Sequence, residues 1–210
     1  MLLKGLGRRR FGTFRPVRGT KDMFDEDIQG LRRIEDIARS ISQRFGFAEV
    51  STPVLERTGV FTRTLGESSD VVNKEMYTFK DKSDENICLR PENTAGVMRA
   101  LLHSRTALLR SRSEKLFYTG PMFRRERPQR GRLRQFHQIG LEYCGTKHAC
   151  ADVEVIEAAT EFLRHLELWP ESLELQINSL GDRESRTRYE EEITKYFESH
   201  RSSLSRDSVE

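Results

Sequence analysis

Two pairs of strand-like segments, each pair joined by a polar loop, constrain the fold of this 210-residue chain most strongly. "EMYTFKD" (75–81) and "NICLRPE" (86–92) form the first pair, with a turn over Asp81–Glu85. "KLFYTGPMFRR" (115–125) and "LRQFHQIGLEYCG" (133–145) form the second, joined by an arginine-rich loop. Segments joined in this way pair as antiparallel hairpins. Because helical patterns separate the hairpins and no βαβ rhythm occurs, we predict an α+β fold: an antiparallel sheet covered by helices on one side.

The spacing of apolar residues predicts helices in much of the remaining chain. These helices cover residues 25–45, 93–103, 152–165 and 184–200. Acidic residues favour the start of the first helix, and we expect Asp152 to cap the third. Pro53, in the extended stretch "GFAEVSTPVLE" (46–56), confines that strand to an edge or interrupts it. The alternation of "LELQI" (173–177) predicts one more strand.

Charge and cysteine content exclude several kinds of site. The net charge is only +3, so an anion-binding site must come from local clustering. The three cysteines form no C-x-x-C pair, and the group Cys144, His148 and Cys150 lacks a fourth ligand at zinc-finger spacing, so we predict reduced thiols and no metal site.

No apolar run approaches the roughly 20 residues of a membrane helix. The glycine motifs G-x-G-x-x-G and the P-loop do not occur, so side chains would have to hold any nucleotide.

The first 21 residues carry seven Lys or Arg and no acid. A basic, acid-poor start resembles an organellar transit peptide, although this one lacks serine. A disordered basic tail explains the composition equally well. We expect residues 1–16 to lie outside the fold as a basic extension or transit peptide. The compartment therefore stays open between the cytoplasm and, if the extension is a transit peptide, a mitochondrion or plastid.

Six arginines and one acid, Glu126, lie within the eleven positions 124–134. The planar guanidinium group suits phosphate because it donates two parallel, charge-assisted hydrogen bonds. An arginine-rich loop would also suit an RNA backbone. Glu126 complicates both interpretations, because an acid repels phosphate. It fits only if it orients an arginine, meets a metal or accepts a hydrogen bond from a base amine.

The strand after this loop carries different chemistry on its two faces, because side chains alternate along a strand. The first face holds a cation, an aromatic ring, an amide and a carboxylate, from Arg134, Phe136, Gln138, Gly140 and Glu142. The second is mostly apolar and should pack on helices; it holds Gln135, His137, Ile139, Leu141 and Tyr143. A solvated outer face is the simpler explanation of the first set, but Phe136 is out of place in water. Such a surface could hold phosphate, a flat base and a polar small molecule in sequence.

A second candidate is "LRPENTAG" (89–96), in which Glu92 precedes a predicted helix. An acid at a helix start is stabilised by the helix dipole and needs no ligand to explain it. Alternatively, the Glu92 carboxylate receives the ammonium group of a substrate.

Several motifs in the same order resemble class II aminoacyl-tRNA synthetases, and histidyl-tRNA synthetases in particular, from about Val17 onward. "GFAEVSTPVLE" resembles their motif 1, with its proline at Pro53, and "FRRERPQRGRLRQFHQIGLE" (123–142) resembles their motif 2. Wording specific to the histidyl family occurs in "RGTKD" (18–22), "SDVVNKEMYTF" (69–79), "LRPENTAG" (89–96) and "INSLG" (177–181). The resemblance implies the N-terminal part of a class II catalytic domain.

The family converts histidine and ATP, accompanied by Mg²⁺, to histidyl-adenylate and passes histidine to tRNA(His). By motif position, the resemblance implies that Arg124 is catalytic and binds the α-phosphate. Glu126 would face the adenine amine or its surroundings, Arg132 would reach the distal phosphates and Phe136 would stack on adenine. The histidine-binding residues implied are Glu92, Asn93, Thr94, Gln138 and Glu142.

The resemblance also implies a domain plan. Residues 17–183 would form the catalytic core with motifs 1 and 2, and residues 184–210 would begin the helical region between motifs 2 and 3. The family's second histidine motif, motif 3 and anticodon-binding domain do not occur in these 210 residues, so we expect a truncated chain, inactive alone. Motif 1 implies a homodimer through the 25–45 helix and "EVSTPVLE". Two alternatives remain: a non-catalytic, synthetase-like regulatory subunit, and an RNA-binding protein that uses the arginine loop.

Overall fold

The computed structural model describes residues 14–66, 69–104, 113–168, 170, 172–179 and 181–205. The chain divides into two units, residues 1–169 and 170–210, which are described separately. The first contains α1 (Asp25–Arg44), β1 (Ala48–Glu49), β2 (Leu55–Arg57), α2 (Thr58–Leu65), the π-helical turn η1 (Val71–Glu75), β3 (Tyr77–Lys80), β4 (Asn86–Leu89), α3 (Thr94–Ser104), β5 (Glu114–Phe123), β6 (Gln135–Cys144) and α4 (Ala149–His165). The second contains α5 (Arg183–Ser199) and the short 3₁₀ helix η2 (Arg201–Ser203).

The strands form two three-stranded sheets, ordered β1-β5-β6 and β2-β4-β3. Both predicted hairpins are present, β3 with β4 and β5 with β6, and both are antiparallel. The α+β class is therefore confirmed, with one addition: β1 pairs with β5 in parallel. Pro53 lies between β1 and β2, where the chain leaves the edge of one sheet and enters the edge of the other. This confirms that Pro53 interrupts the extended segment, since proline cannot donate to a strand ladder.

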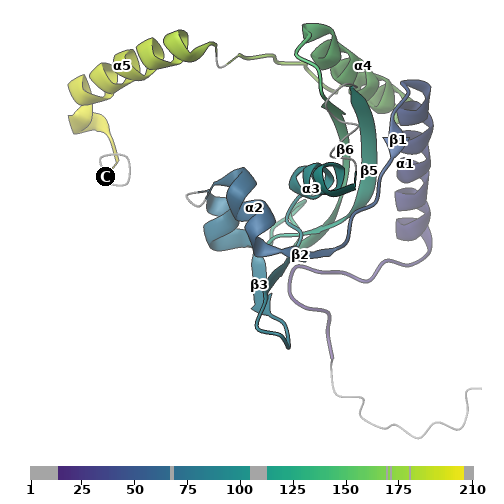
Figure 1. The fold of residues 1–210 in the computed structure, drawn as a ribbon. Coiled ribbons are helices and arrows are strands. Elements are labelled where there is room, and N and C mark those ends of the chain that lie inside the picture. Colours follow the sequence, from purple (N-terminus) through teal and green to yellow (C-terminus); the bar gives the residue numbers. More distant parts are fainter. Residues whose placement is uncertain are drawn as a thin grey trace, which may run out of the picture. The chain divides into compact units, whose positions relative to one another are not determined.

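Helices cover both faces of the β5–β6 pair (Figure 1). On one face, Ile139 and Leu141 line a cavity of about 220 Å³ together with residues of α1 and α4. On the other face, Val97 and Leu101 of α3 pack against apolar side chains of β5, namely Leu116, Tyr118 and Met122. The expectation that helices cover one side only was wrong. The segment after β4 turns back over the sheet, which brings α3 onto the face that carries Phe136, Gln138 and Glu142.

A second apolar cluster joins α2 to the smaller sheet. Phe61 of α2 is fully buried with Met76, Cys88 of β4 and Ala95 of α3. Helix α2 was not predicted, because it is only eight residues long and has a single fully buried side chain. Burial also raises the pKa of the Cys88 thiol to about 11, so this cysteine serves as a core residue.

Two predicted features differ from the structure. Helix α4 begins at Ala149 with His148 at its N-cap, so Asp152 lies in the first turn and does not cap it. "LELQI" is not a strand: residues 173–179 have no regular secondary structure, and its apolar face is exposed, with Ile177 at 74%. A strand is stable only when a neighbour pairs with it, and the described residues offer none here. By contrast, α5 forms as predicted, with Asp182 accepting a hydrogen bond from the Ser185 backbone N–H at 2.8 Å.

Phe117 and Phe79 form a matched pair for testing this core. Both lie in strands, but Phe117 is fully buried and Phe79 is 45% exposed. We predict that Phe117→Ala lowers the free energy of unfolding by about 3–5 kcal/mol, because it leaves a cavity in the β5 layer. Phe79→Ala should cost about 1 kcal/mol or less. Urea unfolding followed by circular dichroism measures both, and equal losses would contradict this core.

Candidate functional site

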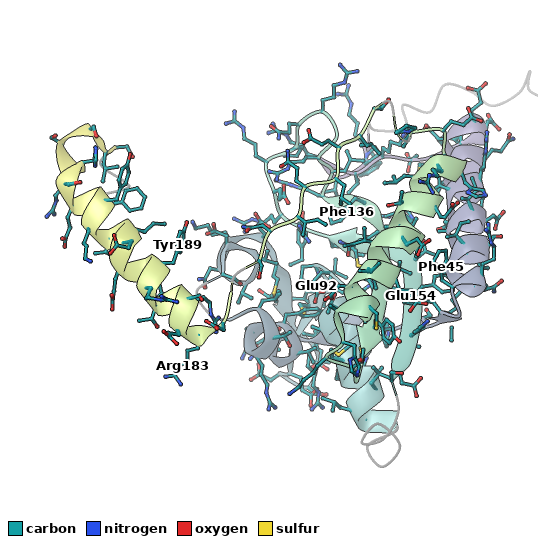
Figure 2. The ribbon with its side chains drawn as sticks, turned by 90° about the horizontal axis from the view of Figure 1, so that it is seen from above. Phe45, Glu92, Phe136, Glu154, Arg183 and Tyr189 are labelled. Atoms are coloured by element: carbon teal, nitrogen blue, oxygen red, sulfur yellow. The ribbon has the colours of Figure 1, made fainter. Side chains whose placement is uncertain are left out.

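The polar face of β6 lies over β5 and against the start of α3. The β5–β6 register places Phe136, Gln138, Gly140 and Glu142 opposite Met122, Gly120, Tyr118 and Leu116. Glu142 accepts a hydrogen bond from the Thr94 hydroxyl at 2.7 Å, which ties β6 to the first residue of α3. The strand face and the "LRPENTAG" segment, which sequence suggested separately, therefore form one site; Figure 2 labels Phe136 and Glu92 within it.

Glu92 occupies the N-terminus of α3. Its two carboxylate oxygens accept hydrogen bonds from the backbone N–H groups of Thr94, at 2.6 Å, and of Ala95, at 3.0 Å. This contact caps the helix and satisfies donors that have no partner inside it. A carboxylate has further lone pairs, so capping fixes the side chain while leaving acceptor capacity for a cation.

Arg124 follows β5 and is held from two sides. Its Nε donates to the Pro91 carbonyl at 2.9 Å, and its guanidinium carbon lies 5.3 Å from the centre of the Phe136 ring. The contact with Pro91 uses only Nε, so the outer nitrogens can still form the planar fork that suits phosphate. The aromatic face beside the guanidinium favours a cation at this position.

Glu126 orients arginines within the arginine-rich loop. Its side chain is only 13% exposed, and it forms ion pairs with Arg132 at 3.1 Å and, more loosely, with Arg124 at 3.9 Å. The loop is also braced by the N-terminal "RGTKD" segment, because the Arg134 N–H donates to the Gly19 carbonyl at 2.6 Å. Gly19 has a φ of +87°, and a Cβ there would lie 2.8 Å from the Arg134 side chain, so glycine is required.

The remaining two histidine-site candidates have different surroundings. The Gln138 amide oxygen is shielded from solvent and has no hydrogen-bond partner among the described residues. Such an orphaned acceptor is costly unless a ligand donates to it. Asn93, in contrast, is only 1% exposed and contacts the Thr52 hydroxyl and Arg90 beneath the site. The structure therefore groups Asn93 with the interior and not with the other candidates.

Sequence reasoning missed Tyr118, which lies on the same face. Its ring covers Gly140, where an added Cβ would lie 2.3 Å from the ring. Burial raises the pKa of Tyr118, and the neighbouring Glu142 and Glu92 raise it further. The pKa of Glu142 is likewise raised, mainly by burial and also by Glu92. Alternation along "KLFYTGPMF" could have revealed Tyr118, but only once its register against β6 was known.

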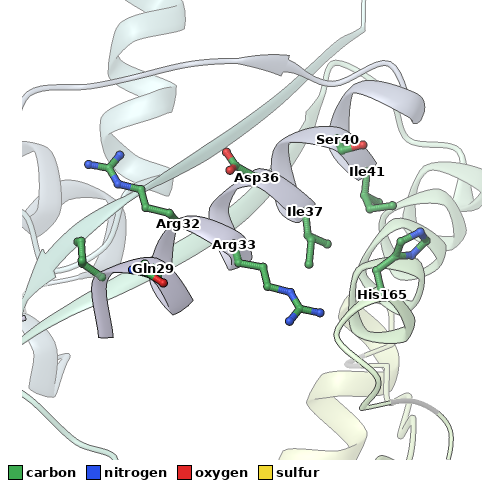
Figure 3. A pocket seen from close by; sticks show the side chains of 9 residues that line it. Gln29, Arg32, Arg33, Asp36, Ile37, Ser40, Ile41 and His165 are labelled. Carbon is green, nitrogen blue, oxygen red and sulfur yellow. The ribbon is translucent and has the colours of Figure 1, made fainter. Parts of the chain in front are cut away.

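A larger hollow lies elsewhere. An open groove of about 750 Å³ runs between α1 and α4, where Figure 3 shows Arg32, Arg33, Asp36 and His165. These helices cover the opposite face of the β5–β6 pair from Phe136 and Glu142. Size alone therefore does not locate the candidate site. Among the described residues, no cluster of His, Cys, Asp and Glu side chains could hold a metal ion, and no helix is long and apolar enough to cross a membrane.

Comparison with known protein families identifies the family to which this chain belongs. The family model described as histidyl-tRNA synthetase matches residues 19–182. The chain belongs to the histidyl-tRNA synthetase family. This confirms the resemblance seen in its motifs, and residues 19–182 include every residue of the candidate site.

Curated relatives and solved structures agree with that assignment. The chain is 52% identical over 195 residues to a histidine–tRNA ligase of Rhodospirillum rubrum, covering 93% of this chain and 46% of the relative. It is 43% identical over 199 residues to a Dictyostelium discoideum protein named "Probable histidine--tRNA ligase, mitochondrial", covering 92% and 40%. The structure of apo Staphylococcus aureus histidyl-tRNA synthetase matches with a TM-score of 0.71 at 34% identity, covering 93% of this chain and 45% of that one. The chain thus spans less than half the length of these family members.

The raised pKa of Glu142 gives this synthetase-family site a measurable pH dependence. The folded chain holds the Glu142 proton more tightly than the unfolded chain does, whose carboxyl titrates near 4.5. Protonation of Glu142 therefore stabilises the folded state at low pH, and this contribution to the free energy of unfolding is lost as pH rises through the raised pKa. Glu142→Gln keeps an oxygen for Thr94 but removes the titration. We predict that the stability of Glu142→Gln relative to wild type increases as pH rises above about 4.5, measured by urea unfolding. A difference independent of pH would contradict this.

Proposed function

We propose that this chain carries the substrate-binding part of a class II histidine–tRNA ligase, which activates histidine with ATP and transfers it to tRNA(His). The observation that supports this most directly is the joining of β6 to the start of α3 through Glu142 and Thr94, beside Arg124 and Phe136. One surface then offers a guanidinium, an aromatic ring, an orphaned amide oxygen and two carboxylates. That combination suits a phosphate, a base and a polar amino acid side by side.

On the ATP side, we assign Arg124 to the α-phosphate as the catalytic residue and Phe136 to stacking on adenine. Attack of the histidine carboxylate on the α-phosphorus brings two anions together, and a fixed guanidinium stabilises the charge that develops. Arg132 reaches the distal phosphates when it leaves its ion pair with Glu126, whose freed carboxylate can then accept from the adenine amine. Mg²⁺ would arrive with ATP and supply further charge neutralisation, held mainly by phosphate oxygens.

On the histidine side, we assign the amino group to Glu92 and Thr94, and the rest of the pocket to Gln138 and Glu142. The Gln138 amide oxygen has no partner in the described chain, so an N–H of histidine would satisfy it. A pocket that hydrogen-bonds its substrate rejects apolar amino acids, because the wrong guest leaves buried polar groups unpaired. Asn93 would act from beneath, through its contacts with Thr52 and Arg90.

The proposal concerns a part of the enzyme. Residues 17–183 would form the catalytic core and residues 184–210 the start of the next helical region, after a basic extension over residues 1–16. The family's second histidine motif and motif 3 do not occur in these 210 residues. The residues assigned to both ligands lie within these 210 positions, so we expect this chain to bind ATP and histidine. The extension suits a mitochondrial or plastid address, and a cytoplasmic one if it is only a tail.

A regulatory role has weaker support. A Bacillus halodurans structure titled as an ATP phosphoribosyltransferase regulatory subunit/histidyl-tRNA synthetase matches with a TM-score of 0.64 at 25% identity, covering 75% of this chain and 39% of that one. A non-catalytic relative has no need to keep ligand-contacting side chains. This chain has all five candidate ligand-contacting side chains: Glu92, Arg124, Phe136, Gln138 and Glu142. The other four line one surface, and Arg124 contacts that surface through Pro91 and Phe136.

Arg124→Ala tests the ATP assignment. We predict that it weakens ATP binding by roughly tenfold to hundredfold, the value of one charge-assisted contact, measured by isothermal titration calorimetry. Arg130→Ala, an exposed change in the same loop, serves as the control and should change affinity by no more than about twofold. If the loop instead binds RNA, both substitutions would weaken RNA binding to a similar extent, each lowering the salt slope by about one. Equal ATP affinity in Arg124→Ala and wild type would contradict the assignment.

We also propose a homodimer through α1 and the 49–56 segment. Leu55 in the edge strand β2 is 51% exposed, and such an apolar side chain on an open strand edge is stabilised by a partner. Sedimentation at micromolar concentration should give twice the 24.5 kDa chain mass. Leu55→Asp should shift it to monomer, whereas Val153→Asp, at a 61% exposed position in α4, should not. A wild-type monomer would refute this arrangement.

A further inference from the structure

Arg90 immediately precedes Pro91, which contacts Arg124 on the proposed ATP side, and Glu92, which lies on the proposed histidine side. It follows β4, and only 5% of its surface is exposed. Its backbone N–H donates to the Val54 carbonyl at 3.0 Å, and its carbonyl accepts from the Phe123 N–H at 3.0 Å. Arg90 thereby joins the segment after Pro53 to the end of β5, one residue before Arg124.

The buried guanidinium of Arg90 connects three further points. Its Nε donates to the Pro121 carbonyl at 3.0 Å, and its Nη1 donates to the Thr52 carbonyl at 2.8 Å and to the Thr52 hydroxyl at 3.2 Å. A longer contact of 3.4 Å joins Nη1 to the Asn93 side-chain oxygen. A Cβ on Gly120 would lie 2.6 Å from Nη2, so any larger residue there would displace the end of the Arg90 side chain. The guanidinium therefore occupies a space that the sheet leaves open for it.

Every acceptor that the described residues offer this guanidinium is neutral. Burial lowers the pKa of Arg90, although hydrogen bonds to carbonyl oxygens keep it satisfied. A buried cation without a charged partner is a poor way to stabilise a core, since an apolar side chain of similar volume often does as well or better. This argues that Arg90 is present for the geometry that its planar fork imposes.

Arg124 depends on that geometry. Its Nε donates to the Pro91 carbonyl at 2.9 Å, and Pro91 is the residue next to Arg90. Glu92 and Thr94 follow in the same short segment, and Asn93 between them is bonded to Arg90 and contacts Thr52. A small displacement of this segment would turn the Arg124 fork and move the Glu92 carboxylate at the same time. Misplacement by about 1 Å costs as much as 100-fold in catalysis.

We propose that Arg90 is a positioning residue that fixes segment 89–94, so that Pro91 orients Arg124 for ATP while Glu92 and Thr94 are set for histidine. The identity of the two ligands rests on the proposed function, whereas the effect of Arg90 on the Arg124–Pro91 hydrogen bond does not. With only 5% of its surface exposed, Arg90 is assigned a positioning role and not a ligand contact. It couples the two halves of the site from beneath, which a purely local stabilising residue would not do.

The test compares Arg90→Met and Arg90→Lys with Arg99→Met in the 210-residue chain. Arg99 of α3 pairs with Glu56 at 2.6 Å and serves as the control for losing a partly buried arginine. The first readout is the Nε–H signal of Arg124 in ¹H–¹⁵N spectra, which reports its hydrogen bond to Pro91. The second is the affinity for ATP and for histidine by calorimetry, below the unfolding transition of each variant.

We expect Arg90→Met to abolish the protected Arg124 signal and to weaken both ligands, each by about tenfold or more. Arg99→Met should lower the urea midpoint and change neither readout. Arg90→Met combined with Arg124→Ala should bind ATP no more weakly than Arg124→Ala alone, because Arg90 acts through Arg124. If Arg90→Met does not fold, Arg90→Lys decides by the same readouts, since lysine keeps the charge but lacks the fork.

A folded Arg90 variant that keeps the Arg124 signal and both affinities overturns the proposal. So does additivity in the double variant, which would show that Arg90 acts independently of Arg124. If the wild-type chain binds neither ATP nor histidine, the proposed function fails, and the Arg124 signal alone still decides whether Arg90 positions it.

Discussion

The ten-residue antiparallel ladder between β5 and β6 is the interaction on which the site depends. It holds two strands in one register, with Tyr118 opposite Gly140, and so fixes which side chains share a face. A slip of one residue would turn Phe136, Gln138 and Glu142 towards α1 and α4, because side chains alternate along a strand. The packing of the second face on those helices makes such a slip costly. The polar face of β6 is therefore held in place by the packing of its apolar face on α1 and α4.

The distribution of charge over this ladder favours anions. Arg124 and Arg90 donate their hydrogen bonds to carbonyl oxygens, and Arg124 has in addition only a loose ion pair with Glu126, at 3.9 Å, so most of their charge is left for a ligand. In a partly buried site such charges act on a ligand more strongly than they would in water. Arg132 is the exception among these arginines, because it forms an ion pair with Glu126 at 3.1 Å. This ion pair holds the exposed Arg132 side chain near the site. The arginines thus differ along this loop: Arg124, directly after β5, is held in place, whereas Arg132 beyond it is 63% exposed.

Local patterns predicted the elements well where the pattern and the tertiary partner agreed. Both hairpins formed because polar loops separate apolar, alternating segments, and Pro53 broke the strand as its missing N–H requires. "LELQI" failed because alternation describes only a surface, while a strand needs a neighbour to pair with. Helix α2 escaped prediction for the opposite reason: its pattern is short, and the burial of Phe61 by residues distant in sequence stabilises it.

The sequence by itself determined the family, the two faces of β6 and most candidate site residues, because these depend on residue type and on the spacing of neighbours. Only the tertiary structure decided which candidates meet. Thr94 and Glu142 are 48 positions apart, and no local rule places them at hydrogen-bond distance. The same holds for Tyr118 over Gly140, for Asn93 beneath the site and for Arg90 bonded to Thr52. Contacts of this kind depend on how the sheet register and the return of α3 close the chain on itself, which spacing along the sequence does not encode.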